Sequence, residues 1–258
     1  MRSVTSDLNR HNPSNPGKGS VLGFPVHLVP NYGAWLSERI RNGQGTHVVT
    51  LNAEMTIQAE KTPKLAHIIR SAELVIPDGA GIVLYLQLNG RTVARCPGIE
   101  LSEALLKQSA GDASPWSIFF FGGSPGVASE AAEKLSDRFS GLNIVGTQHG
   151  YIDESDMPSF LERLQALQPQ LVYVGLGVPR QEYWIAQHRH ILPHAVWIGV
   201  GGSFDIWAER KERAPRWLRE NHLEWVYRLY QEPWRWRRML ALPQFAWRAF
   251  LEKLRQPL

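Results

Sequence analysis

The strongest constraint on the fold is a regular alternation of short apolar runs with longer amphipathic stretches. The apolar runs are rich in Val, Ile and Phe and mostly end at Gly, Asp or Asn, which predicts buried strands. They are Leu22–Leu28, His47–Leu51, Leu74–Ile76, Ser117–Phe121, Asn143–Thr147, Leu171–Val174 and Val196–Val200. Amphipathic stretches predict helices at Leu101–Ser109, Val127–Phe139, Met157–Leu167 and Arg180–His190. Alternation of this kind predicts an α/β domain with a mostly parallel sheet and helices on both faces.

The pattern changes after Gly202, where only helical segments follow. Pro215, Pro233 and Pro243 divide this tail, because proline favours the first turn of a helix and interrupts its interior. We therefore expect three parts: a disordered polar arm over residues 1–20, an α/β domain over 21–205 and an all-helical appendage over 206–258. The arm has no apolar core, so it does not predict a secretory signal.

Positive charge and tryptophan are concentrated in the tail. Residues 206–258 contain 12 Lys and Arg against 6 Asp and Glu, a net charge of +6, whereas the rest of the chain has a net charge of −2. Six of the ten tryptophans also lie there. This asymmetry indicates an anionic partner for the tail, which could be a phosphate group, a nucleic acid or a membrane surface.

The last part of the tail predicts an amphipathic helix. At about 100° per residue, one face of residues 234–255 collects Trp236, Met239, Leu240, Trp247, Phe250, Leu251 and Leu254. Outside that face lie Arg235, Arg237, Arg238, Arg248, Lys253 and Arg255, and Pro243 should kink the helix. Either this face lies in a membrane interface, which the density of arginines favours, or it packs on the domain.

Composition excludes several classes of protein. An apolar content of 43% and a charged content of 20% suit a folded globular chain. The single cysteine, Cys96, excludes a disulfide framework and indicates a reducing cytosol. No run approaches the ~18 apolar residues that a membrane-spanning helix needs. The sequence has no HExxH or DxD motif, so we expect neither a metal nor a cofactor.

Polar residues directly after the predicted strands are the candidates for chemistry, because ligands of parallel sheets bind beyond the carboxyl ends of the strands. Thr50 and Asn52 point the same way from an extended segment and could hold a sugar or a base, or Asn52 could cap a helix. Asp78 follows another strand and is backed by Gly79 and Gly81. A carboxylate there suits a general base whose pKa burial would raise, or it could be the N-cap of a helix over 79–88.

Two glycine turns and one arginine could hold phosphate groups. Gly122 and Gly123 lie before a predicted helix, where backbone N–H groups could bind the diphosphate of a nucleotide. A second glycine turn, over residues 175–181, places Gln181 at the start of the next helix. Arg95 precedes Gly98 and could pair with a phosphate, or it could be an ordinary surface arginine.

Several short motifs occur in an order that resembles one known family. They are Thr50-Leu51-Asn52-Ala53, Pro77-Asp78-Gly79, Arg95-Cys96-Pro97-Gly98-Ile99-Glu100-Leu101, Phe120-Phe121-Gly122-Gly123, Val178-Pro179-Arg180-Gln181-Glu182, Gly199-Val200-Gly201-Gly202, Arg213-Ala214-Pro215, Leu223-Glu224-Trp225-Val226-Tyr227-Arg228-Leu229 and Gln231-Glu232-Pro233. This order resembles the WecG/TagA/CpsF family of N-acetylmannosaminyltransferase-like glycosyltransferases of bacterial surface polysaccharide assembly. The similarity runs from about residue 21 to about residue 238.

The resemblance implies an inverting, metal-independent enzyme with a Rossmann-like α/β domain. Such enzymes move a sugar, typically N-acetylmannosamine, from a UDP donor to a polyprenyl-diphosphate-linked sugar at the cytoplasmic face of the cell membrane. The family's aspartate base falls on Asp78, and its threonine and asparagine fall on Thr50 and Asn52. Its substrate-binding arginine and glutamine fall on Arg95 and Gln181.

The resemblance also implies that the basic tail brings the enzyme to the membrane and completes the site with arginines, for which Arg213 and Arg228 match best. The glycosyltransferase interpretation includes no nucleic-acid partner. A homo-oligomer is compatible with it, because several basic tails could then engage one surface.

Two other classes of protein offer alternatives. A basic aromatic tail is also typical of modules that bind single-stranded nucleic acid or an anionic membrane without catalysis. A nicotinamide-dependent oxidoreductase would use a similar sheet, but neither glycine turn has GxGxxG spacing followed by an acidic residue ~20 positions later.

Overall fold

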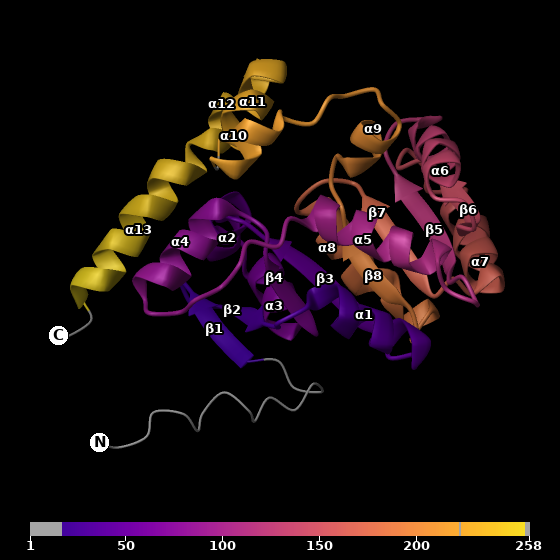
Figure 1. The fold of residues 1–258 in the computed structure, drawn as a ribbon, viewed down its shortest axis with the longest axis horizontal. Helices are drawn as coiled ribbons and strands as arrows, with labels where there is room; N and C mark the ends of the chain where they lie inside the picture. The colour runs from indigo at the N-terminus through magenta and orange to yellow at the C-terminus, as the bar shows by residue number, and fades with distance from the viewer. Residues whose placement is uncertain (1–16, 222, 256–258) are drawn as a thin grey trace.

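A six-stranded parallel sheet forms the centre of the molecule (Figure 1). The computed structural model describes residues 17–221 and 223–255. The sheet order is β4-β3-β8-β7-β5-β6, and every pairing in it is parallel. The strands are β3 (Thr46–Leu51), β4 (Leu74–Pro77), β5 (Ser117–Gly122), β6 (Asn143–Gln148), β7 (Leu171–Gly175) and β8 (Val196–Gly199). The predicted α/β class is confirmed.

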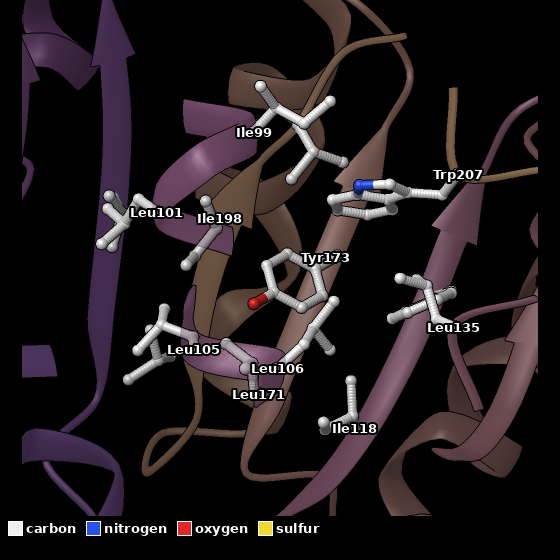
Figure 2. Close-up of a cluster of buried hydrophobic side chains, with 14 of the residues drawn as sticks. Ile99, Leu101, Leu105, Leu106, Ile118, Leu135, Leu171, Tyr173, Ile198 and Trp207 are labelled. Atoms are coloured by element: carbon white, nitrogen blue, oxygen red, sulfur yellow. The ribbon is translucent and has the colours of Figure 1, made fainter. Parts of the chain in front are cut away.

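Helices cover both faces of this sheet because side chains alternate between the faces along each strand. On one face, Ile118 and Phe120 of β5 pack with four helices, as Figure 2 shows in part. These helices are α1 (Tyr32–Arg41), α5 (Gly98–Ala110), α6 (Val127–Arg138) and α9 (Ser203–Trp207). Phe119 and Phe121 point to the other face and pack with α7 (Met157–Leu167) and α8 (Arg180–His188).

A second cluster on that other face covers β3 and β4. It contains residues of α2 (Ala53–Lys61), α3 (Pro63–Ser71) and α4 (Ala80–Leu88). Every residue of β3 is buried, as expected for a strand with neighbours on both sides and helices on both faces. The carboxyl end of β3 therefore lies well inside the molecule.

The predicted first strand, Leu22–Leu28, is not part of the parallel sheet. It contains the turn and second strand of an antiparallel hairpin, β1 (Gly17–Val21) and β2 (Phe24–Leu28). Leu22 and Gly23 have φ angles of 49° and 78°, and two such residues make the turn that best matches strand twist. The hairpin packs beside β4, where the backbone N–H of Val75 donates to Nδ1 of His27.

The hairpin also changes the boundary of the predicted N-terminal arm. Residues 17–20 belong to β1, which pairs along its whole length with β2. The remainder of the predicted arm, residues 1–16, lies outside the described residues. Residues 17–20, which the sequence placed in the arm, therefore form part of a strand.

The tail is helical, as predicted. It contains α10 (Arg216–Glu220), α11 (Glu224–Gln231), α12 (Trp236–Met239) and α13 (Ala241–Arg255), with a short 3-10 turn at Pro233–Arg235; another such turn, Arg189–Ile191, follows α8. Pro243 lies in the first turn of α13, so the chain breaks before it instead of kinking a longer helix. Within the described ranges, no helix has the length and apolar character needed to span a bilayer.

Helix α13 runs along α2 and α4 and packs there through a face that the sequence did not single out (Figure 1). Phe245 is 4% exposed, and Leu242 and Ala249 pack beside it. Most of the predicted apolar face points to solvent instead: Trp236, Leu240, Trp247, Phe250 and Leu254 are exposed. That face is therefore unpartnered within the described chain.

Candidate active site

Thr50, Asn52 and Asp78 lie together at the carboxyl ends of β3 and β4. The backbone N–H of Asp78 donates to Leu51 O at 3.0 Å, which joins the two strand ends. A Cβ atom added to Gly79 would lie 3.0 Å from Cβ of Asn52, and one added to Gly98 would lie 2.7 Å from Cγ2 of Thr50. These glycines therefore let the three polar residues approach one another and the start of α5.

The carboxylate of Asp78 binds the start of α5, not the start of α4. Its Oδ1 accepts a hydrogen bond from the backbone N–H of Gly98 at 2.8 Å. The N-cap of α4 is Gly79, so the alternative that Asp78 caps that helix is wrong. Burial raises the pKa of Asp78, and the nearby charge of Glu224 adds to this, while the Gly98 N–H group, Arg228 and Arg95 oppose it.

Asn52 caps a helix, as one of its two predicted interpretations had it. Its Oδ1 accepts from the backbone N–H of Met55 at 2.9 Å, at the start of α2. Within the described chain its side-chain NH₂ group makes no hydrogen bond. Thr50 is 8% exposed, and its hydroxyl donates to Gly199 O at 3.4 Å. Capping thus leaves the amide donor of Asn52 unused beside Asp78.

The tail adds an arginine cluster to this edge of the sheet. Arg95 donates to the backbone O of Asp78 at 2.8 Å and to Oε2 of Glu224 at 2.9 Å. Arg228 donates to Oε1 of Glu224 at 3.0 Å, and Nε of Arg213 lies 3.9 Å from the same oxygen. The structure therefore brings together three arginines that the sequence predicted for substrate binding, one from the α/β domain and two from the tail.

The glycine turn after β5 lies apart from this cluster. Four strand spacings of about 4.8 Å, roughly 19 Å in all, separate β5 from β4 in the sheet order. Gly122 and Gly123 have φ angles of 133° and 69°, and Gly123 N donates to Gly175 O at 3.0 Å. Their backbone conformation leads the chain from β5 toward α6, whose N-cap, Gly126, provides no side-chain hydrogen bond.

Gln181 is 2% exposed, and both ends of its side-chain amide are occupied. Its Oε1 accepts from Gly201 N at 3.0 Å, and its Nε2 donates to Oε1 of Glu182 at 3.0 Å. Oε2 of Glu182 in turn lies 2.8 Å from Nε2 of His47 in a fully buried pair. The geometry thus makes Gln181 a support for the turn after β8, and its substrate-binding role stays a prediction.

A cavity of about 750 Å³ adjoins the arginine cluster. It lies between the loop after β2, the segment 90–97 and the first turns of α5, and Arg95 and Glu100 are in its wall. Asp78 is not among the lining residues. In the described ranges, no three His, Cys, Asp or Glu side chains gather as metal ligands would, and metal independence stays a prediction.

Glu224 is the residue of this site that reasoning from the sequence missed. The signal was present in the motif Leu223-Glu224-Trp225, which places one carboxylate at the start of a helix in a strongly basic tail. Arg95 is remote from Glu224 in sequence, and Arg213 and Arg228 lie at different places in the tail. The cluster therefore becomes visible only when the chain is folded.

The chain matches the Glycosyl transferase WecG/TagA/CpsF family over residues 19–258 and belongs to that family. The sheet with polar groups at its carboxyl edge is therefore the fold of a glycosyltransferase. The chain is 36% identical over 226 residues to the N-acetylglucosaminyldiphosphoundecaprenol N-acetyl-beta-D-mannosaminyltransferase of Bacillus spizizenii strain W23, covering 87% of this chain and 84% of the relative. A protein of the same name from Bacillus subtilis strain 168 is 34% identical over 203 residues, 78% of each chain. The predicted family and enzyme class are confirmed.

Proposed function

We propose that this enzyme transfers N-acetylmannosamine from a UDP donor to a polyprenyl-diphosphate-linked N-acetylglucosamine. The names of the two relatives support the sugar and the acceptor. The observation that carries the chemistry is the position of Asp78, a buried carboxylate of raised pKa with Arg95 and Arg228 nearby, at the edge of an arginine cluster that also contains Arg213. The raised pKa makes Asp78 a stronger base than an ordinary aspartate, and the arginines suit a diphosphate leaving group.

The reaction is a single inverting displacement. Asp78 accepts the proton of the acceptor hydroxyl, whose oxygen forms a bond to the anomeric carbon from the face opposite UDP. The bond between that carbon and the diphosphate oxygen breaks, and UDP leaves with the electron pair. Arg95, Arg213 and Arg228 stabilise the negative charge on the departing diphosphate without a metal.

Other residues bind and support the substrates. The free amide of Asn52 and the hydroxyl of Thr50 hold the sugar beside Asp78. The turn at Gly122 and Gly123 and the first N–H groups of α6 bind an outlying part of the donor nucleotide. For Gln181 we propose a supporting role, since its amide holds Gly201.

The tail is proposed to hold the enzyme on the inner face of the cell membrane. Trp247, Phe250 and Leu254 are 60%, 54% and 66% exposed along one side of α13. Aromatic and aliphatic side chains on the outer side of a basic helix are typical of interfacial binding, and the acceptor is a lipid. We place the enzyme there as a peripheral membrane protein.

A donor panel tests the proposed function. The purified enzyme is incubated with each of several UDP-sugars and a synthetic polyprenyl-diphosphate N-acetylglucosamine, with and without EDTA. The molecular mass of the lipid product is then measured by mass spectrometry. We expect a gain of one N-acetylhexosamine from UDP-N-acetylmannosamine, unchanged by EDTA. Transfer from a different sugar only would contradict the donor, and a product that requires Mg²⁺ would contradict the metal-independent displacement.

A further inference from the structure

Glu224 is an unusual residue for its place in the chain. It begins α11 in the basic tail, yet it is only 7% exposed, and glutamate is almost never buried without a partner. Its partners are all arginines: Arg95 at 2.9 Å, Arg228 at 3.0 Å and Arg213 at 3.9 Å. One carboxylate therefore collects guanidinium groups from two distant parts of the sequence.

The Glu224 carboxylate is connected to the candidate base through the side chain of Arg95. Arg95 uses Nη2 to bind Glu224 and Nε to bind the backbone O of Asp78. Glu224 and Arg95 are 129 residues apart in sequence. This path gives the position of α11 a direct influence on the backbone that carries Asp78.

The surrounding cluster retains an excess of positive charge. Four guanidinium groups, those of Arg95, Arg213, Arg219 and Arg228, face three carboxylates. These are Glu224, Glu100, which pairs with Arg213 and Arg219, and Asp78, which lies near Arg95 and Arg228. Nε of Arg213 and Nε of Arg219 are buried without a hydrogen-bond partner among the described residues. Glu224 thus offsets the mutual repulsion of the arginines while leaving donors and charge for an anion.

We propose that Glu224 is a positioning residue that docks α11 against the α/β domain and holds Arg95, Arg213 and Arg228 together beside Asp78. The inference rests on the proposed function, in which those arginines stabilise the departing diphosphate. Glu224 itself contacts no reacting atom. Its effect is to fix the arginines before the substrate arrives, so that no reorganisation is needed as charge develops.

Glu224→Gln tests this proposal, with Glu220→Gln as the matched control. Both remove one negative charge from the tail, but Glu220 is exposed and, among the residues that the structure describes, pairs only with Arg216 within α10. We expect Glu224→Gln to lower kcat about 10- to 100-fold, as small misplacements of catalytic groups do, with a smaller change in the KM for the donor. Glu220→Gln should stay within about twofold of the wild type, consistent with the small effect of exposed pairs.

Two further measurements separate positioning from general damage. In an Arg95→Gln background, the additional loss from Glu224→Gln should shrink markedly, because the two groups act as a unit. Hydrogen exchange of residues 224–231 should be faster in Glu224→Gln than in Glu220→Gln, which can be measured without any turnover. An equal loss in both backgrounds, or unchanged exchange in α11, would overturn the proposal. Absence of transfer by the wild type would instead refute the proposed function, while the exchange data would still test the docking.

Discussion

Asp78 is held in its buried position at a cost to the folded state. Its raised pKa means that the protonated form is favoured in the folded protein, because burial penalises the charge more than Gly98 N–H, Arg228 and Arg95 stabilise it. A group of this kind contributes stability below its unfolded-state pKa, and that contribution is lost as pH rises through the higher folded-state pKa. Above that folded-state pKa, the ionised carboxylate makes the folded state less stable than its protonated form would.

Asp78→Asn should therefore be more stable than the wild type at pH 7. The amide keeps an oxygen for Gly98 N–H and removes the buried charge. We expect Tm to rise by a few degrees, since about 1 kcal/mol corresponds to ~2–4 °C in a chain of this size. Thermal unfolding between pH 4 and pH 8 should show the difference shrinking toward the acid end. A Tm below that of the wild type at pH 7 would show that the carboxylate is a net stabilising group.

At the scale of the elements, the strands and helices of the central sheet could be predicted from local patterns. Segments such as Leu171–Val174 are buried on both faces of the sheet and therefore contain apolar residues along their whole length. The hairpin could not be distinguished from a single strand, because its turn depends on the backbone conformation of Leu22 and Gly23 within one apolar stretch. The packed face of α13 was also missed, because Phe245 gains its partners only from α2 and α4.

The site could be predicted only as a set of separate residues. Asp78, Thr50, Asn52 and Arg95 follow from strand ends and from the family's motifs. The role of Glu224 depends on a contact between residues 95 and 224, which no local pattern contains. The burial of Gln181 likewise depends on the turn at Gly201, which closes over its amide.

Substitutions on the two sides of α13 should separate its packed face from its exposed face. Phe245→Ala removes a ring that is 4% exposed and should lower the free energy of unfolding by about 3 kcal/mol, as large-to-small changes in cores do. Trp247→Ala removes a larger ring that is 60% exposed and should change it by less than about 0.5 kcal/mol. Urea unfolding measures both. Equal losses would mean that α13 does not pack through the Phe245 side.

At the scale of the whole molecule, part of the positive charge of the tail is paired with glutamates of the α/β domain. Arg238 pairs with Glu54 at 2.5 Å, Arg248 with Glu60 at 3.5 Å and Arg210 with Glu130 at 2.5 Å, so tail cations neutralise acids of the α/β domain. Several large aromatic side chains of the tail are also exposed, including Tyr230 at 81% and Trp234 at 72%. Membrane binding should therefore depend on aromatic insertion as well as on charge.

Vesicle flotation tests that expectation. The double variant Trp247→Ser and Phe250→Ser should bind anionic vesicles at least tenfold more weakly, because each buried apolar side chain is worth about 1.5–3 kcal/mol. Tyr151→Ser, which alters an exposed aromatic residue outside the tail, should bind as the wild type does. A gel shift with single-stranded RNA provides the counter-test. Tight RNA binding without flotation would favour a nucleic-acid module.

The rate of sugar transfer by Asp78→Asn, measured beside its affinity for UDP, tests the central claim most directly. A positioned base contributes ~10²–10⁴-fold, so the variant should transfer N-acetylmannosamine slower by that factor while binding UDP as the wild type does. A variant that folds, binds UDP and turns over within a factor of about two of the wild type would contradict the role of Asp78 as the base.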